Sequence, residues 1–551
     1  MPLRVADSRS VFETGDTRID GGGSGCKSCC HRNQMQTRWK IFLAVALFVV
    51  LSVGISLLTM RVQPESKVEA YKKLLREKGE KLAISELLPP PVPAESNSVN
   101  AVEDAFRLFV SGSEKIPAAM RMIAPGKALV GWSQPDVRGF DNSGDFTNSW
   151  DEFTAEVAAD RPAIELLHQV LERPRLDFQL DYKKGFALLL PHLAPLKRSA
   201  QMLETAAVCN LHAGDPGAAA TNILTLLALV QRNAAEGFLI SHLVRIAMTA
   251  IAVAPTWELL QATNVTDAQL AAVQKGWEQM DFLSDATNVY VLERTVGMDT
   301  IEKSRATHEE FEKIFGLSSF MSSSSSSASG GWGWEAMTEK PRYAVAEVMW
   351  RSSWSYADEL RTLQSEQIIL ETLRTMQTNQ SQFYKADYDA MNTRLSSLGI
   401  TNAGAAFFRA LEIPDLSEMF GGNWISSSVR KTMQMETADR VVVTAIALKR
   451  FQVQHGKWPA TLTELVPEFF SSVPIDPYAG TPLHYHPKAD GTYLLYSVGD
   501  NGKDDGGDPT NSTSGGSNPN YSWQNLRARD WVWPQPATAA EIKNFHEHPP
   551  K

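Results

Sequence analysis

A group of cysteines near the N-terminus is the first set of residues that could bind a metal. Cys26, Cys29, Cys30 and His31 lie within a few positions of one another. A structural zinc site needs four well-placed thiolate or imidazole ligands. No second cysteine pair follows, because the remaining cysteine, Cys209, stands alone in the sequence. We therefore predict free thiols rather than a metal site, and no disulfide framework.

Two histidine pairs offer weaker metal chemistry. His484 and His486 alternate along a predicted strand, so both rings face one side of it, and a polar sheet face is the favoured interpretation. His546 and His548 lack the H-E-x-x-H spacing that places two imidazoles on one helix face. The sequence also shows no glycine-rich phosphate loop after a strand and no nucleophile elbow. We therefore predict no catalytic residue and no enzyme activity.

Aromatic and charged residues in the middle of the chain allow two interpretations. Trp350, Trp354 and Tyr356 could form a binding surface, but their helical spacing favours a place in the core. Glu293 and Arg294 are adjacent in the sequence, and we expect them to form an ion pair.

Composition places the chain among globular proteins. It has 551 residues, of which 43% are hydrophobic and 21% charged, and this is enough for several domains. Its formal net charge of -10 argues against a nucleic-acid partner, since neutralising phosphates requires clustered Lys and Arg.

An uncharged apolar run from Ile41 to Met60 predicts one membrane crossing. Lys40 and Arg61 flank the run and Trp39 lies at its near interface. Basic residues occur on both sides, so charge alone does not fix the orientation. The thiols, which would stay reduced in a cytosol, favour an N-terminus inside the cell and the bulk of the chain outside the cytoplasm.

The remaining chain predicts a mainly α fold: a single N-terminal transmembrane helix, an irregular array of helical hairpins, and a small α+β module at the C-terminal end. A Gly-Asp-Pro turn at Gly214–Pro216 separates two apolar stripes, which indicates an antiparallel helical hairpin. Thr266 and Gln269 form a capping box that opens a helix over 267–280. The predicted boundaries are a flexible cytoplasmic tail (1–38), the transmembrane anchor (39–61), a juxtamembrane helix with a proline-rich linker (62–99), a helical domain (100–317), a Ser/Gly-rich loop (318–335), a helical continuation (336–430), the α+β module (431–536) and a tail (537–551).

The C-terminal module combines one long helix with short strands. The helix runs over 433–454 and ends at Gly456, and Thr461 begins a short helical turn that Pro467 stops. Two strands follow over 482–485 and 492–498, and the second leads into an acidic, glycine-rich loop. A small sheet of this kind needs the helix to cover its apolar face.

This order of residues resembles the type II secretion system protein G family, the major pseudopilins. The matching positions are Phe451, Gly456, Pro459, Leu462, Leu465, Val466, Pro467, Asp476, Pro477, Gly480, Pro482, Leu483, Tyr485, Tyr496, Ser497 and Gly499. The chain departs from the family because no pilin leader precedes Ile41 and a long helical region follows Met60. The resemblance therefore implies a pseudopilin-like module on an anchored helical protein, not an ordinary pilus subunit.

The resemblance also implies calcium as a cofactor, because the acidic loop of that family binds it. The implied ligands are Val498 through its carbonyl group, Asp500, Asn501, Asp504, Asp505, Asp508 and, returning from further along the chain, Asp530. Calcium takes six to eight oxygen ligands on a flexible loop, and the glycines in this loop permit such bends. The alternative is a solvated acidic turn without a metal.

These patterns predict a non-enzymatic protein of a bacterial inner membrane that acts as a scaffold or interaction component. The membrane and envelope proteins are its expected partners. Two alternatives stay open: an envelope enzyme with an unrecognised site in the helical domain, and a peptide- or glycan-binding module.

Overall fold

The computed structural model divides into two compact units, residues 1–63 and 64–551, which are described separately. The structure describes residues 40, 42–48, 51–52, 65–109, 115–313, 347–379, 381–398, 423–510 and 529–548. In the first unit the described residues are helical and expose apolar side chains, with Phe42 65% and Phe48 71% exposed. The predicted tail (1–38), most of the predicted anchor, the N-terminal cysteines and the Ser/Gly-rich loop (318–335) lie outside the described residues.

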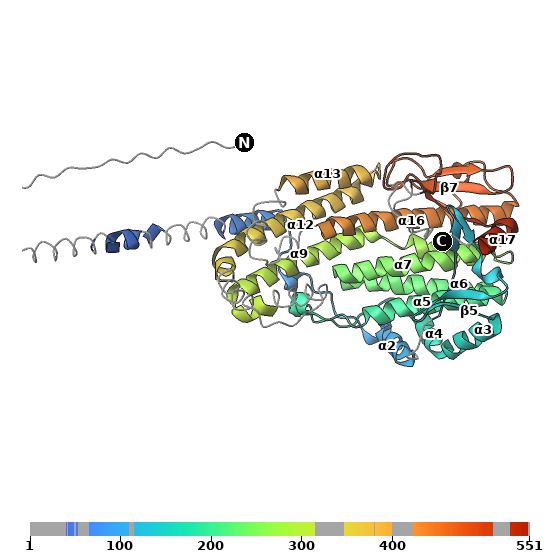
Figure 1. Ribbon diagram of the computed structural model, residues 1–551, viewed down its shortest axis with the longest axis horizontal. Coiled ribbons are helices and arrows are strands. Elements are labelled where there is room, and N and C mark those ends of the chain that lie inside the picture. Colours follow the sequence, from blue (N-terminus) through green and yellow to red (C-terminus); the bar gives the residue numbers. More distant parts are fainter. Residues whose placement is uncertain are drawn as a thin grey trace, which may run out of the picture. The chain divides into compact units, whose positions relative to one another are not determined.

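The second unit is mainly helical, as the sequence predicts, and carries small sheets. After a helix over 65–77, the longer helices are α2 (Val99–Leu108), α3 (Trp150–Ala159), α4 (Arg161–His168), α5 (Leu193–His212), α6 (Pro216–Arg232), α7 (Leu239–Leu260), α8 (Asp267–Glu278), α9 (Phe282–Ala306), α12 (Ser355–Thr378), α13 (Tyr384–Ser397), α16 (Asn423–His455) and α17 (Ala539–Glu547). The long central helices lie alongside one another (Figure 1). Helix α17 lies within 537–551 and so corrects the prediction of a tail there. Thr538 and Glu541 cap its first turn reciprocally.

Nine short strands form three sheets in the described part of the chain. The strands are β1 (Ile116–Pro117), β2 (Arg121–Ala124), β3 (Lys127–Leu129), β4 (Val137–Asp141), β5 (Gly144–Asn148), β6 (His484–Pro487), β7 (Tyr493–Ser497), β8 (Trp531–Val532) and β9 (Gln535–Pro536). Their orders are β1-β4-β5, β2-β3-β9 and β6-β7-β8. Only β3 and β9 pair in parallel.

Strands β1 to β5 correct the prediction that 100–317 is helical throughout. Gly139 allows β1 and β4 to pair closely, because a side chain at this position would meet the Ile116 carbonyl oxygen at 1.9 Å. Asp141 Oδ1 accepts a hydrogen bond from the Ser143 amide and so shapes the turn into β5. Strands of two to five residues are too short to show a clear alternating pattern in the sequence.

The predicted helical hairpin is present and is formed by α5 and α6. Asp215 caps α6 by accepting a hydrogen bond from the Ala218 amide, and Pro216 occupies the first turn. The capping box at Thr266 and Gln269 is also present, although α8 ends at Glu278. Local sequence signals therefore located these helix ends to within a few residues.

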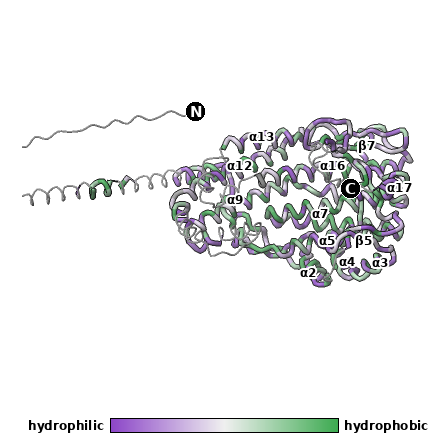
Figure 2. The backbone as a smooth tube through the Cα atoms, in the orientation of Figure 1, coloured by the Kyte–Doolittle hydropathy of each residue, from purple (hydrophilic) through white to green (hydrophobic). Residues whose placement is uncertain are grey.

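Helix α7 is a buried core helix. Within the described residues it is the one helix long and apolar enough to cross a membrane, and 56% of its most apolar window is buried. Hydrophobic residues predominate along α7, whereas hydrophilic residues predominate along α13 (Figure 2). The fully buried Arg245 interrupts α7, donates to the Val230 carbonyl group and pairs with Asp285 at 2.8 Å. A charge held in this way by its neighbours fits a protein interior.

One apolar core joins the early helices to the C-terminal module. Its members extend from Val102 on α2 to Trp533 after β8, and α16 supplies a long stretch of them. The Trp257 indole on α7 donates to the Pro534 carbonyl group at 2.9 Å. Arg450 on α16 binds Asp267 at the start of α8 at 2.8 Å. The C-terminal α+β module is thus packed into the helical body.

A buried ion network fastens the N-terminal part of this unit to α9 and α12. Arg294 is fully buried and donates to Glu80 at 2.9 Å. The predicted ion pair between Arg294 and its neighbour Glu293 is therefore wrong. Glu293 instead accepts from the Leu239 amide at 2.8 Å. Burial alone would raise the pKa of Glu80, but hydrogen bonds from Arg374, Gln367 and Arg294 outweigh it and lower that pKa to about 2.

We predict that Arg294→Met destabilises the protein by about 3 kcal/mol, because the buried Glu80 carboxylate then loses one of its two guanidinium partners. The free energy of unfolding of the full chain, measured by urea denaturation in detergent, tests this. Arg107→Met on α2 is the matched control, since Arg107 makes ion pairs at an exposed position and should cost at most about 0.5 kcal/mol. Equal effects of the two variants would contradict a structural role for the network.

Candidate functional site

The loop after β7 is the site that the sequence points to, and the structure brings its predicted residues together around Asp530. Asp530 is fully buried and accepts hydrogen bonds from the amides of Gly507 (2.7 Å), Asp508 (3.0 Å) and Asp505 (3.3 Å). Its own amide donates to the Asp508 carbonyl group at 2.9 Å. Burial raises the pKa of Asp530, and these three hydrogen bonds oppose the rise.

The other predicted ligands each face a partner of their own. Asp504 Oδ1 accepts from the Tyr496 hydroxyl and from the Gly506 amide, both at 2.9 Å. Asp500 accepts from the Gln434 side chain on α16 at 3.0 Å. Asn501 donates to Asp505 at 2.8 Å. The Val498 amide donates to the buried Asp476 carboxylate, and the Thr510 amide donates to Asp508. His484 lies 3.6 Å from the Asp504 carboxylate, and Arg529 lies 3.7 Å from that of Asp508.

This arrangement does not present the loop carboxylates to a single ion. In the described residues, one group of three His, Cys, Asp or Glu side chains brings its ligand atoms within 4.8 Å of one another, and it lies elsewhere in the chain. Asp504 and Asp530 already accept hydrogen bonds from backbone amides of the same loop. Asp530 therefore has a role that needs no metal, and calcium binding stays a prediction.

The glycines of the loop are needed for its geometry. Gly506 and Gly507 have φ angles of 76° and 78°, which L side chains rarely adopt. A side chain at Gly507 would also meet Leu494 at 2.7 Å. The sequence signal of acidic residues alternating with glycine therefore reflects backbone geometry at least as much as ligand chemistry.

The group that does converge is His308, Glu312 and Glu347. His308 Nδ1 lies 2.9 Å from both carboxylate oxygens of Glu347, and Arg351 donates to the same carboxylate at 2.9 Å. A guanidinium already neutralises Glu347, so this group is an ion-pair network rather than a strong metal site.

The other predicted positions are structural. Trp350 and Tyr356 are buried, and the Trp350 indole donates to Asp358 at 2.7 Å, which confirms the core interpretation for these two residues. His484 stacks on Tyr496 with ring centroids 4.7 Å apart, and the His486 ring lies 6.3 Å from the same tyrosine. Both histidines therefore lie on one face of the sheet, as predicted.

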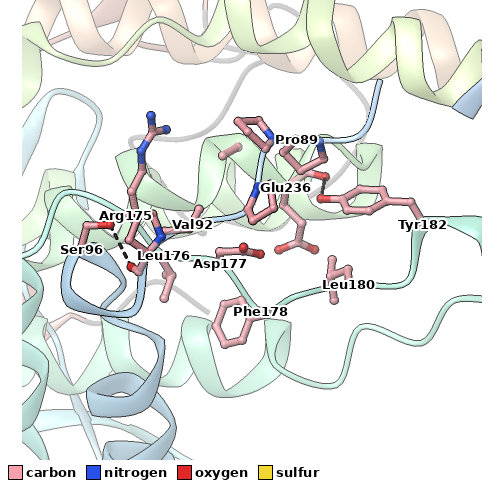
Figure 3. A pocket seen from close by; sticks show the side chains of 14 residues that line it. Pro89, Val92, Ser96, Arg175, Leu176, Asp177, Phe178, Leu180, Tyr182 and Glu236 are labelled. Atoms are coloured by element: carbon pink, nitrogen blue, oxygen red, sulfur yellow. Dashed lines mark hydrogen bonds between the residues drawn. The ribbon is translucent and has the colours of Figure 1, made fainter. Parts of the chain in front are cut away.

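A cavity of about 210 Å³ that sequence reasoning missed lies between the proline-rich segment 89–93 and the chain around 175–182 (Figure 3). Its wall includes Phe178, Tyr182 and the buried Glu236 at the end of a short 3₁₀ helix, η6 (Asn233–Glu236). Glu236 accepts from the Ser241 hydroxyl and pairs with His192 at 2.8 Å. The carboxylate thus lies between the serine and the histidine, whereas a nucleophilic triad needs the histidine in the middle.

Buried carboxyl groups elsewhere are also perturbed. On α7, Glu258 accepts from the amides of Met120 (2.7 Å) and Gly131 (2.9 Å), and burial nevertheless raises its pKa. Glu204 on α5 has no hydrogen-bond partner among the described residues, and burial together with the charge of Glu258 raises its pKa to about 8. On α9, burial raises the pKa of Glu293 to about 7.

Comparison with known protein families, curated proteins and solved structures finds no match for this chain.

We predict that stability falls as pH rises from about 5 to 9, because the folded state holds a proton on Glu204 that the unfolded chain releases near its ordinary pKa of 4.5. Glu204→Gln should flatten this slope and stabilise the protein by about 2 kcal/mol at pH 9. Urea denaturation across this range measures it. Glu165→Gln, at an exposed site on α4, should keep the wild-type slope, and an unchanged slope for Glu204→Gln would contradict the assignment.

We predict that Asp530→Ala opens the acidic loop, because three backbone amides lose a buried acceptor at a cost of about 3 kcal/mol. Limited proteolysis followed by mass spectrometry should show rapid cleavage within 499–510 in the variant only. Asp490→Ala, at an exposed turn before β7, is the control. Protection of the wild-type loop that appears only with calcium, and not with a chelator, would show instead that a metal holds it.

Proposed function

We propose that this chain is a non-enzymatic, single-pass protein of a bacterial inner membrane, with the bulk of the chain outside the cytoplasm. In this proposal its pseudopilin-like C-terminal module serves as a scaffold or interaction component for envelope proteins. Calcium binding by the acidic loop stays a prediction within the proposal. Limited proteolysis of the wild-type loop with calcium and with a chelator tests it.

The observation that carries the proposal is the exposure of the helical residues in the first unit. The exposed apolar side chains are Phe42, Leu43, Val45, Leu47, Phe48 and Leu51, each at least 55% exposed. A helix that is apolar on every side is not stable in water, and the hydrocarbon core of a bilayer accommodates it. The length of the uncharged run from Ile41 to Met60 supports the same interpretation.

The integration of the C-terminal module supports the scaffold role over that of a pilus subunit. Much of α16 is buried among α7, α8 and α9 of its own chain, which leaves little of this helix for packing against neighbouring copies. The alternative of a peptide- or glycan-binding module, with the tryptophans as its binding surface, is less favoured because Trp350 and Tyr356 are buried.

We predict that the full chain stays in the membrane pellet after an alkaline carbonate wash, and that the double variant Leu47→Arg/Leu51→Arg is released. Each arginine near the bilayer centre costs about 3 kcal/mol of insertion free energy. Leu189→Arg is the control, because Leu189 lies in the second unit and is 82% exposed. Release of the wild-type chain would refute the anchor. The orientation is tested by fusing a periplasm-active reporter after Lys551, and a silent reporter would show that the bulk of the chain lies inside the cytoplasm.

A further inference from the structure

The cavity under the proline-rich segment has an acidic wall. Asp177 and Glu236 both line it. Burial raises the pKa of the Tyr182 hydroxyl, and the nearby charges of Glu236 and Asp177 raise it further. Arg175 is the one Lys or Arg among the lining residues, but its side chain is exposed and points away from the two carboxylates (Figure 3). The cavity therefore favours a positively charged group.

The two carboxylates differ in what they can still bind. Glu236 uses Oε1 to accept from Ser241 and Oε2 to pair with His192, so it is held rigidly. Asp177 uses Oδ1 to accept from the Gln179 amide at 2.8 Å, and its Oδ2 makes no hydrogen bond within the described part of the chain. Asp177 is thus the carboxylate with an oxygen available to a ligand.

The remaining walls suit an aliphatic chain. Prolines 89–91 and 93 with Val92 form one side, and Phe178 forms part of the other. A volume of about 210 Å³ lies below the roughly 300–1,000 Å³ of typical small-molecule sites, so the occupant has the size of a side chain.

We propose that this cavity binds a primary ammonium group on a short aliphatic chain, with Asp177 as its ion-pair partner. A free alkylamine and the lysine side chain of a peptide share this chemistry. The proposal is independent of the membrane anchor and of the acidic loop, because none of the residues that line the cavity belongs to either.

Isothermal titration of the detergent-solubilised full chain with hexylamine and with N-acetyl-lysine methylamide tests the proposal. We expect saturable binding of at least one amine and none of hexanol, which lacks the charge. Preferential binding of the lysine derivative would identify a peptide side chain as the source, and preferential binding of hexylamine a free amine. Absence of amine binding, or equal binding of hexanol, would overturn the proposal.

Two variants locate the binding. Asp177→Asn keeps the Oδ1 acceptor and should weaken amine binding at least tenfold, whereas Asp181→Asn, at an exposed position in the same segment, should leave it unchanged. Ala235→Leu, which adds bulk to the cavity wall without touching a carboxylate, should abolish binding. Thermal unfolding checks that each variant is folded. If Asp177→Asn does not fold, the amine binding of Ala235→Leu tests the proposal alone. Undiminished binding in a folded Asp177→Asn or Ala235→Leu variant would overturn the proposal.

Discussion

The burial of α16 is the constraint on which the rest of the second unit depends. This helix packs against α7, α8 and α9 and also covers β7, so it belongs both to the helical body and to the small sheet beside it. Polar contacts fix its register: Arg450 binds Asp267, and Arg440 donates to the Ile475 carbonyl group. Since one helix serves two layers, the C-terminal module and the helical body form a single cooperative structure.

Charge in the interior gives this packing its specificity. Apolar helix faces tolerate sliding, whereas Arg294, Arg245 and Glu258 each require particular partners at particular positions. Each such group loses hydration on burial and recovers that free energy only in the native arrangement. The resulting penalties weigh against alternative alignments of α7, α9 and α12.

Local signals allowed much of the fold to be predicted from the sequence. Thr266 with Gln269, and Asp215 with Pro216, act within one helical turn, so their effects can be recognised without knowledge of tertiary contacts. Pairing of distant segments could not be predicted in this way. Strand β9 pairs with β3, and Gly139 is required only because β1 approaches it, so neither feature has a local signature.

The two candidate sites differ in the same way, since one lies on a contiguous segment and the other joins distant segments. The acidic loop is visible in the sequence because its residues are contiguous, but the use of Asp530 as an acceptor for backbone amides depends on the fold. The cavity was missed because prolines 89–91 indicate only a break in helix, and Asp177 and Glu236 come from separate segments. No short-range pattern connects them.

The contact between Trp257 and Pro534 spans 277 positions, and this separation has a consequence for synthesis on the ribosome. The apolar faces of α7 and α8 emerge well before the segment that covers them, so the nascent chain carries a hydrophobic surface for many seconds at ordinary rates of translation. Completion of the core must wait for the segment around Trp533 and Pro534. During that interval the nascent chain is open to aggregation through the uncovered faces of α7 and α8.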